Sequence, residues 1–154
     1  MAGVITFIEG GTVTTTPGFS AGATYAGLKT YAEDKLDLAV ILSEAPCVAA
    51  GVFTTSAIRS PSVTVNQEHL AQGLVRAIVV NAGIANTCVG AQGYKDAQEM
   101  TALAGRRTGL TPEEVLVCST GIIGVELPMA LVRQNIGNIH ISEEGGPQFA
   151  RAIM

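Results

Sequence analysis

The sequence has little charge, no tryptophan and no long apolar run. Only 14% of its 154 residues are charged, against about 25% in an average soluble domain, whereas 47% are hydrophobic. So few charged residues are not enough to cover the surface of an isolated domain. We therefore expect another chain, or another part of the same chain, to cover some of this surface. No stretch reaches the roughly 18 consecutive apolar residues of a membrane span, so none is expected.

Several functional classes lack their sequence signatures. The net charge is −4 and Arg106-Arg107 is the one basic pair, which argues against nucleic-acid binding. The N-terminus has no basic segment followed by an apolar core, so we expect no signal peptide. No CxxC, HxxxH, nucleotide-binding glycine motif or GxSxG elbow occurs, and no metal site is expected. The three cysteines predict reduced, buried thiols in a cytoplasmic protein: Cys47, Cys88 and Cys118.

The hydrophobic pattern predicts strands and helices within one domain, residues 1–154, without an internal boundary. Apolar or alternating runs predict strands at residues 4–9, 36–43, 47–54, 62–66, 77–83 and 115–118, and residues 18–29 form an extended, glycine-rich segment. Helical spacing and end signals predict helices at residues 94–107, 128–137 and 147–154, with a single capped turn at 111–114. His69 is expected in a short helical turn, solvated at the surface.

The strand at 115–118 leads into small residues that can bind negative charge. Gly121 can adopt a positive φ and allow a close approach to the backbone. The hydroxyl of Thr120 and free backbone N–H groups at the strand end are the parts of an oxyanion hole. The alternative is a plain turn in which Ser119 and Thr120 bond their own backbone, and spacing alone favours this alternative.

A second loop of small residues, 81–93, follows the strand at 77–83. Its asparagines and glycines predict a backbone shaped for close approach, or simply an asparagine-rich turn. Cys88 lies in this loop, but no basic residue or histidine is nearby to lower its pKa, which argues against a catalytic thiol.

Short stretches along the whole chain form one further pattern. They are Pro17-Gly18-Phe19, Ala26-Gly27-Leu28-Lys29, Asp37-Leu38-Ala39, Ala50-Gly51-Val52-Phe53-Thr54, Val79-Val80-Asn81-Ala82-Gly83, Ala85-Asn86, Gly90, Gln92-Gly93, Ser119-Thr120-Gly121-Ile122-Ile123-Gly124 and Ala152-Ile153-Met154. In this order they resemble the N-terminal part of the ornithine acetyltransferase family, the bifunctional glutamate N-acetyltransferases of arginine biosynthesis. The pattern departs from the family at Ile84, where asparagine is frequent, and at Thr87, where alanine is frequent.

The resemblance implies an α/β fold, a layered sandwich of sheets flanked by helices that a second (β) chain completes. The family's precursor cuts itself, and the new N-terminal threonine of the β chain becomes the nucleophile, which is therefore not in this chain. It transfers acetyl from N-acetylornithine to glutamate through an acyl-threonine intermediate. Some members also use acetyl-CoA as donor, and no other cofactor is implied.

The resemblance also assigns a role to this chain. It places the oxyanion hole at Thr120 and Gly121, which makes this the favoured interpretation of residues 115–124. It further implies a cytoplasmic α2β2 heterotetramer that is inactive without the β chain. In the family the α chain continues a few dozen residues past the position of Met154, so further substrate contacts are expected there.

Two other functions remain open from the sequence. A related self-cleaving aminopeptidase would use the same kind of N-terminal nucleophile. A non-catalytic small-molecule-binding domain built on residues 81–93 would bind a ligand as this chain alone. Release of amino acids distinguishes the first from acetyl transfer, and ligand binding without a β chain distinguishes the second.

Overall fold

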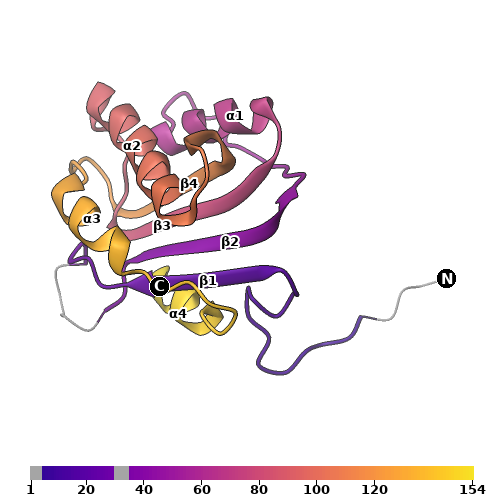
Figure 1. The fold of residues 1–154 in the computed structure, drawn as a ribbon. Coiled ribbons are helices and arrows are strands. Elements are labelled where there is room, and N and C mark those ends of the chain that lie inside the picture. The colour runs from indigo at the N-terminus through magenta and orange to yellow at the C-terminus, as the bar shows by residue number, and fades with distance from the viewer. Residues whose placement is uncertain (1–4, 30–34) are drawn as a thin grey trace.

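The computed structural model describes residues 5–29 and 35–154, which form one four-stranded sheet with helices on both faces (Figure 1). The strands, in sheet order, are β1 (Phe19–Thr24), β2 (Leu38–Cys47), β3 (Val75–Ile84) and β4 (Val115–Ile122). β1, β2 and β3 pair antiparallel, and β3 pairs with β4 in parallel. The predicted α/β class is confirmed. The second sheet of the expected sandwich and the partner chain stay predictions.

The helices are α1 (Pro61–Gln72), α2 (Gly90–Thr108), α3 (Met129–Asn135) and α4 (Gly146–Ala152), with single turns η1 (Pro112–Glu114) and η2 (Ile136–Asn138). α1, α2 and α3 lie on one face of the sheet, and α4 packs on β1 and β2 from the other (Figure 1). The larger core lies under the first group, where strand valines meet helix side chains: Val40, Val79, Val117, Val65, Met100 and Val132. A smaller core around Phe149 holds α4 to the sheet.

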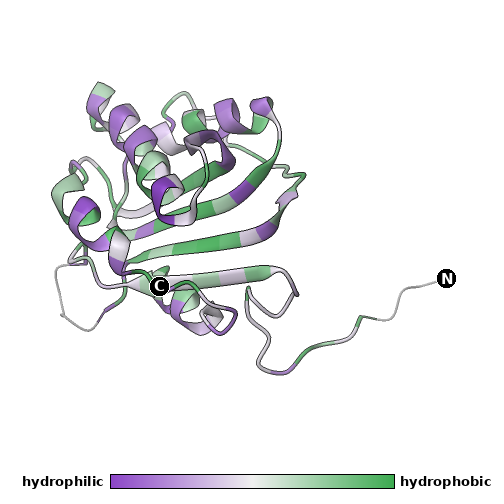
Figure 2. Ribbon diagram, in the orientation of Figure 1, coloured by the Kyte–Doolittle hydropathy of each residue, from purple (hydrophilic) through white to green (hydrophobic). Residues whose placement is uncertain are grey.

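Most elements follow from local sequence. The predicted strands at 36–43, 77–83 and 115–118 are β2, β3 and β4, whose centres are buried and apolar (Figure 2). α2 contains the predicted helix and stops at Gly109, which has the left-handed φ of +74° expected of a glycine cap. The predicted single turn is η1, in which Thr111 N donates to the Glu114 carboxylate at 2.9 Å. The two C-terminal helices are confirmed as α3 with η2, and α4.

Three predicted strands are wrong. Residues 5–9 of the first are irregular, with Phe7 93% exposed, and its first residue lies outside the described residues. Residues 48–54 are irregular, with Val52 fully exposed, because β3 takes the place beside β2 that this segment would need. Residues 62–66 belong to α1, where Ser60 caps the first turn and Pro61 begins it.

The prediction of a solvated His69 is also wrong. Its side chain is 8% exposed, and Nδ1 lies 2.7 Å from the carbonyl oxygen of Val115. One turn earlier on α1, the Asn66 side chain accepts from Val117 N at 2.8 Å and donates to Val117 O at 2.9 Å. Asn66 therefore bonds to β4 as another strand would, and α1 closes this part of the sheet edge.

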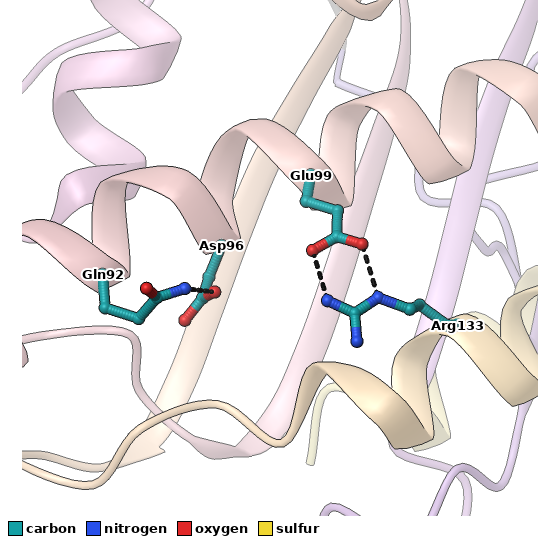
Figure 3. Close-up of polar contacts among 4 residues, drawn as sticks. All are labelled: Gln92, Asp96, Glu99 and Arg133. Carbon is teal, nitrogen blue, oxygen red and sulfur yellow. Dashed lines mark hydrogen bonds and ion pairs between the residues drawn. The ribbon is translucent and has the colours of Figure 1, made fainter.

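An ion pair joins α2 to α3. The Arg133 guanidinium donates to both carboxylate oxygens of Glu99, at 2.6 and 2.7 Å (Figure 3). The same face of α2 carries Gln92, whose amide donates to Asp96 at 2.8 Å. The hydrogen bonds from Arg133 hold the pKa of Glu99 below its ordinary value of 4.5.

Replacing Glu99 by glutamine should therefore lower stability in a pH-dependent way. Because the folded-state pKa of Glu99 is lowered, its contribution is present above 4.5 and is lost as the pH falls through the lowered value. We expect the thermal midpoint of Glu99→Gln to lie slightly below wild type at neutral pH, since both side chains are partly exposed. The difference should disappear on acidification. A difference that persists or grows in acid would contradict this, and Glu44→Gln, at an exposed site, is the matched control.

Candidate functional site

The small residues after the predicted strand at 115–118 do not form a tight turn. Ser119, Thr120 and Gly121 continue β4 and pair with Asn81, Ala82 and Gly83 of β3. The parallel neighbour is long enough to keep them in the sheet, and the chain bends only after Ile122. Gly121 has a φ of +129°, so the predicted positive φ is confirmed.

The predicted close backbone approach at Gly121 is present. A Cβ atom there would lie 2.2 Å from the backbone carbon of Gly83. A Cβ atom on Gly83 would in turn lie 2.5 Å from the carbonyl oxygen of Leu28. Three backbone segments thus contact one another with no side chain between them. The position of Gly121 is therefore fixed by β3 and by the turn that follows β1.

Thr120 presents an unused hydroxyl. Its side chain is exposed, on the sheet face opposite buried Val115 and Val117, and it makes no hydrogen bond to any residue that the structure describes. Ser119 Oγ is buried and also finds no partner within the described ranges. The plain turn with Ser119 and Thr120 bonding their own backbone is therefore not what forms.

Every second residue of β4 directs its backbone groups away from β3, toward the edge of the sheet. Val115 and Val117 direct their backbone groups outward, where His69 and Asn66 bind them. Backbone groups of an edge strand alternate between the neighbouring strand and the open side, so regular alternation from Val117 predicts an outward N–H at Gly121. The site therefore combines a side-chain hydroxyl and a main-chain donor on adjacent residues, the two kinds of group that stabilise an oxyanion.

Thr120 and Gly121 line a cavity of about 570 Å³, a size typical of small-molecule sites. The end of β4, the turn after β1 and the end of α4 surround it. Lys29, Lys35 and Arg151 contribute three positive charges to its wall, and no acidic side chain of the described residues lines it. The wall that the described residues form is therefore positively charged.

The turn after β1 is built around Asp37, which belongs to the family pattern but for which no role was predicted from the sequence. Its carboxylate is fully buried and accepts from the backbone N–H groups of Ala26, Leu28 and Lys29, at 2.6, 2.7 and 3.0 Å. An acidic residue inside the apolar run Leu36-Asp37-Leu38 was the available signal, because a buried charge needs dedicated partners.

The loop at 81–93 uses its asparagines internally. Asn81 donates to Ile84 O at 2.9 Å and Asn86 to Gly93 O at 2.6 Å, and both side chains are fully buried. The predicted close backbone approach is nevertheless confirmed at Gly83, where a Cβ atom would lie 2.5 Å from the carbonyl oxygen of Leu28, and residues 81–84 belong to β3 rather than to a turn. Residues 90–93 already belong to α2.

The cysteines are free but not buried as predicted. Cys88 and Cys118 are exposed, and Cys47 is half-buried. Partial desolvation still raises the pKa of the Cys118 thiol above its ordinary value of 9.0, so this thiol is protonated near neutral pH and is a weak nucleophile.

Residues 5–29 and 35–154 form neither a metal cluster nor a helix that could span a membrane. These residues contain no group of three or more His, Cys, Asp or Glu side chains that could hold a metal ion. None of the helices they form is long and apolar enough to cross a membrane.

Solved structures of arginine-biosynthesis enzymes have this fold. The arginine biosynthesis bifunctional protein ArgJ of Bacillus halodurans aligns with a TM-score of 0.88 and 36% identity, over 95% of this chain and 76% of that one. The ornithine acetyltransferase of Mycobacterium tuberculosis, solved in complex with ornithine, aligns with a TM-score of 0.87 and 34% identity, over 93% of this chain and 78% of that one. The chain is therefore a mixed α/β domain of the same class as these two proteins.

Sequence relatives identify the family. The ArgJ family profile matches residues 20–154. The bifunctional protein ArgJ of Dehalococcoides mccartyi is 42% identical over the whole chain, and that of Geobacter sulfurreducens is 44% identical over 89% of it. The chain belongs to the ArgJ family, which confirms the predicted resemblance. It spans 38% and 35% of the length of these two relatives.

Proposed function

We propose that this chain is the α part of a self-processed enzyme that transfers acetyl from N-acetylornithine to glutamate. Membership of the ArgJ family supports this reaction, and the Mycobacterium tuberculosis relative binds ornithine, the product that such a transfer would leave. The observation that carries the proposal is the unused Thr120 hydroxyl beside Gly121 in a cationic cavity.

In the proposed reaction, Thr120 and Gly121 form the oxyanion hole. A nucleophilic hydroxyl attacks the acetyl carbonyl carbon, and the carbonyl oxygen becomes negatively charged. The Thr120 hydroxyl and the Gly121 N–H donate to that oxygen before ornithine departs with its α-nitrogen. The same two donors act again when the α-nitrogen of glutamate attacks the acyl-threonine ester. Acetyl-CoA would enter the same cycle as an alternative acetyl donor.

The nucleophile is proposed to be the N-terminal threonine of a β chain cut from the same precursor. Such a threonine uses its own α-amine as base and needs neither a histidine nor an aspartate. The lengths of two related chains support cleavage of the precursor. This chain covers 38% of the Dehalococcoides mccartyi protein but 76% of the Bacillus halodurans chain in the crystal structure. The active assembly is proposed to be a cytoplasmic α2β2 heterotetramer.

The proposal is tested first on the natural, full-length gene product. Intact mass and N-terminal sequencing should show two chains, the second beginning with threonine. Acetyl transfer from N-acetylornithine to glutamate should then be measured, with release of amino acids from peptides as the competing activity. A single uncut chain without acetyl transfer would contradict the proposal, and peptide hydrolysis without acetyl transfer would favour the aminopeptidase.

A further inference from the structure

Four buried side-chain atoms in the described part of the chain make no hydrogen bond to it. They are the hydroxyl oxygens of Ser62 and Ser119 and the amide oxygens of Asn81 and Asn86. A buried polar atom without a partner is costly, and native folds pair nearly all of them. All four belong to segments that meet at one end of the sheet, on the face that α1 and α2 cover.

Asn81 and Ser119 are neighbours on that face. They are register partners near the ends of β3 and β4. Their side chains point to the same side as those of Val79 and Val117, two residues earlier on each strand, which lie in the larger core. The amide nitrogen of Asn81 donates to Ile84 O at 2.9 Å, so its amide oxygen is the acceptor that remains.

α1 directs Ser62 toward the same strand ends. Asn66 and His69 of this helix bond to Val117 and Val115, so α1 runs antiparallel to β4. Ser62 precedes Asn66 by one turn on the same helix face. It is therefore the next residue in this series, on the side toward the end of β4.

Asn86 lies beside the start of α1. Its backbone carbonyl accepts from Ser60 Oγ at 2.8 Å. A Cβ atom on Gly93 would lie 2.5 Å from the amide oxygen of Asn86 and 3.1 Å from Pro61 Cγ. The amide nitrogen of Asn86 donates to Gly93 O, which again leaves the amide oxygen as an acceptor directed into the interior.

We propose that these four groups bind one buried water, and that Ser119 and Asn81 act through it as positioning residues for the oxyanion hole. The two amide oxygens accept and the two hydroxyl groups donate. A water molecule offers two donors and two acceptor sites, and buried waters make two to four hydrogen bonds to such polar groups. Four uncharged groups also suit a neutral ligand.

The positioning role rests on the proposed function. Ser119 directly precedes Thr120, and Asn81 lies two residues before Gly83, whose backbone contacts Gly121. A water bonded to both strand ends therefore fixes them at the point where the two oxyanion donors begin. Because small displacements of catalytic groups are costly in rate, loss of this anchor should lower kcat by about tenfold.

The test uses the full-length enzyme and Ser119→Ala. We expect this variant to fold, to lose about tenfold in kcat and to keep its KM nearly unchanged. Ser119→Thr keeps the hydroxyl group in a strand and should retain most of kcat. Ser20→Ala is the matched control, because it removes a half-buried hydroxyl from β1 at the opposite edge of the sheet and should leave kcat unchanged.

High-resolution crystal structures of the wild type and of Ser119→Ala test the water itself. The wild type should show a water within hydrogen-bond distance of Ser119 Oγ and Asn81 Oδ1, and the variant should lack it and show Thr120 displaced. A direct hydrogen bond between Ser119 and Asn81, or a metal cation at this place, would overturn the water. A wild-type kcat in Ser119→Ala, even with lowered stability, would overturn the positioning role.

The remaining outcomes also decide the inference. If Ser119→Ala does not fold, Ser62→Ala removes another of the four groups, and an unchanged water and kcat in that variant would overturn the proposal. If the wild type transfers no acetyl group, the proposed function fails separately. The crystal structures then decide: a water lost together with a displaced Thr120 supports the inference, and an unmoved Thr120 contradicts it.

Discussion

Thr120→Ala is expected to lower kcat of the full-length enzyme by about 10²- to 10³-fold, the usual effect of removing one oxyanion donor. Folding should be nearly unchanged, because the Thr120 side chain is exposed and makes no hydrogen bond within the described part of the chain. KM should change little, since the donor acts on charge that develops during the reaction.

Steady-state kinetics with N-acetylornithine and glutamate measures this effect. Thr120→Ser keeps the hydroxyl and should retain most of the activity. Thr55→Ala removes the same atoms at an exposed site away from the cavity and should behave as wild type. A wild-type kcat in Thr120→Ala would remove the oxyanion assignment.

Asp37→Ala should have the largest effect on stability, lowering the free energy of unfolding by about 3–5 kcal/mol. The Asp37 carboxylate is fully buried and accepts three backbone N–H groups. Alanine leaves these three donors without partners in a closed interior. The turn that they hold also contacts Gly83 through Leu28, so activity should fall together with stability.

Urea unfolding of the full-length protein measures the loss. Asp37→Asn keeps one acceptor oxygen and should be less destabilised than Asp37→Ala. Glu44→Ala removes an exposed carboxylate from β2, the strand that follows Asp37, and should change stability by less than about 0.5 kcal/mol. A loss below about 1 kcal/mol for Asp37→Ala would show that water or other groups satisfy the turn.

The elements that could be predicted from the sequence are those whose secondary structure is determined by their own residues. The apolar runs of β2 and β3 have no other stable place than the centre of a sheet. Gly109 ends α2 because few other residues adopt its φ. Gly121 was recognised for the same reason, although it proved to lie within β4 rather than in a turn.

The errors share a different cause. Val63 and Val65 alternate as in a strand, but the helix start at Ser60-Pro61 and the pairing of β2 with β3 decide the structure of that segment. The cavity could not be predicted, because Lys29 and Arg151 are far apart in the sequence and meet only when α4 packs on the sheet. Asp37 could have been found from its apolar neighbours, but not its three backbone partners.

The Asn66 side chain has a consequence for self-association. An unpaired sheet edge recruits strands from other molecules, and β4 is the parallel edge of this sheet. Asn66 and His69 occupy that edge at Val117 and Val115, so a second molecule cannot pair there without displacing α1. A newly made chain in which α1 has not yet docked exposes this edge. The helix α1 is thus also the element that blocks strand pairing between copies at Val115 and Val117.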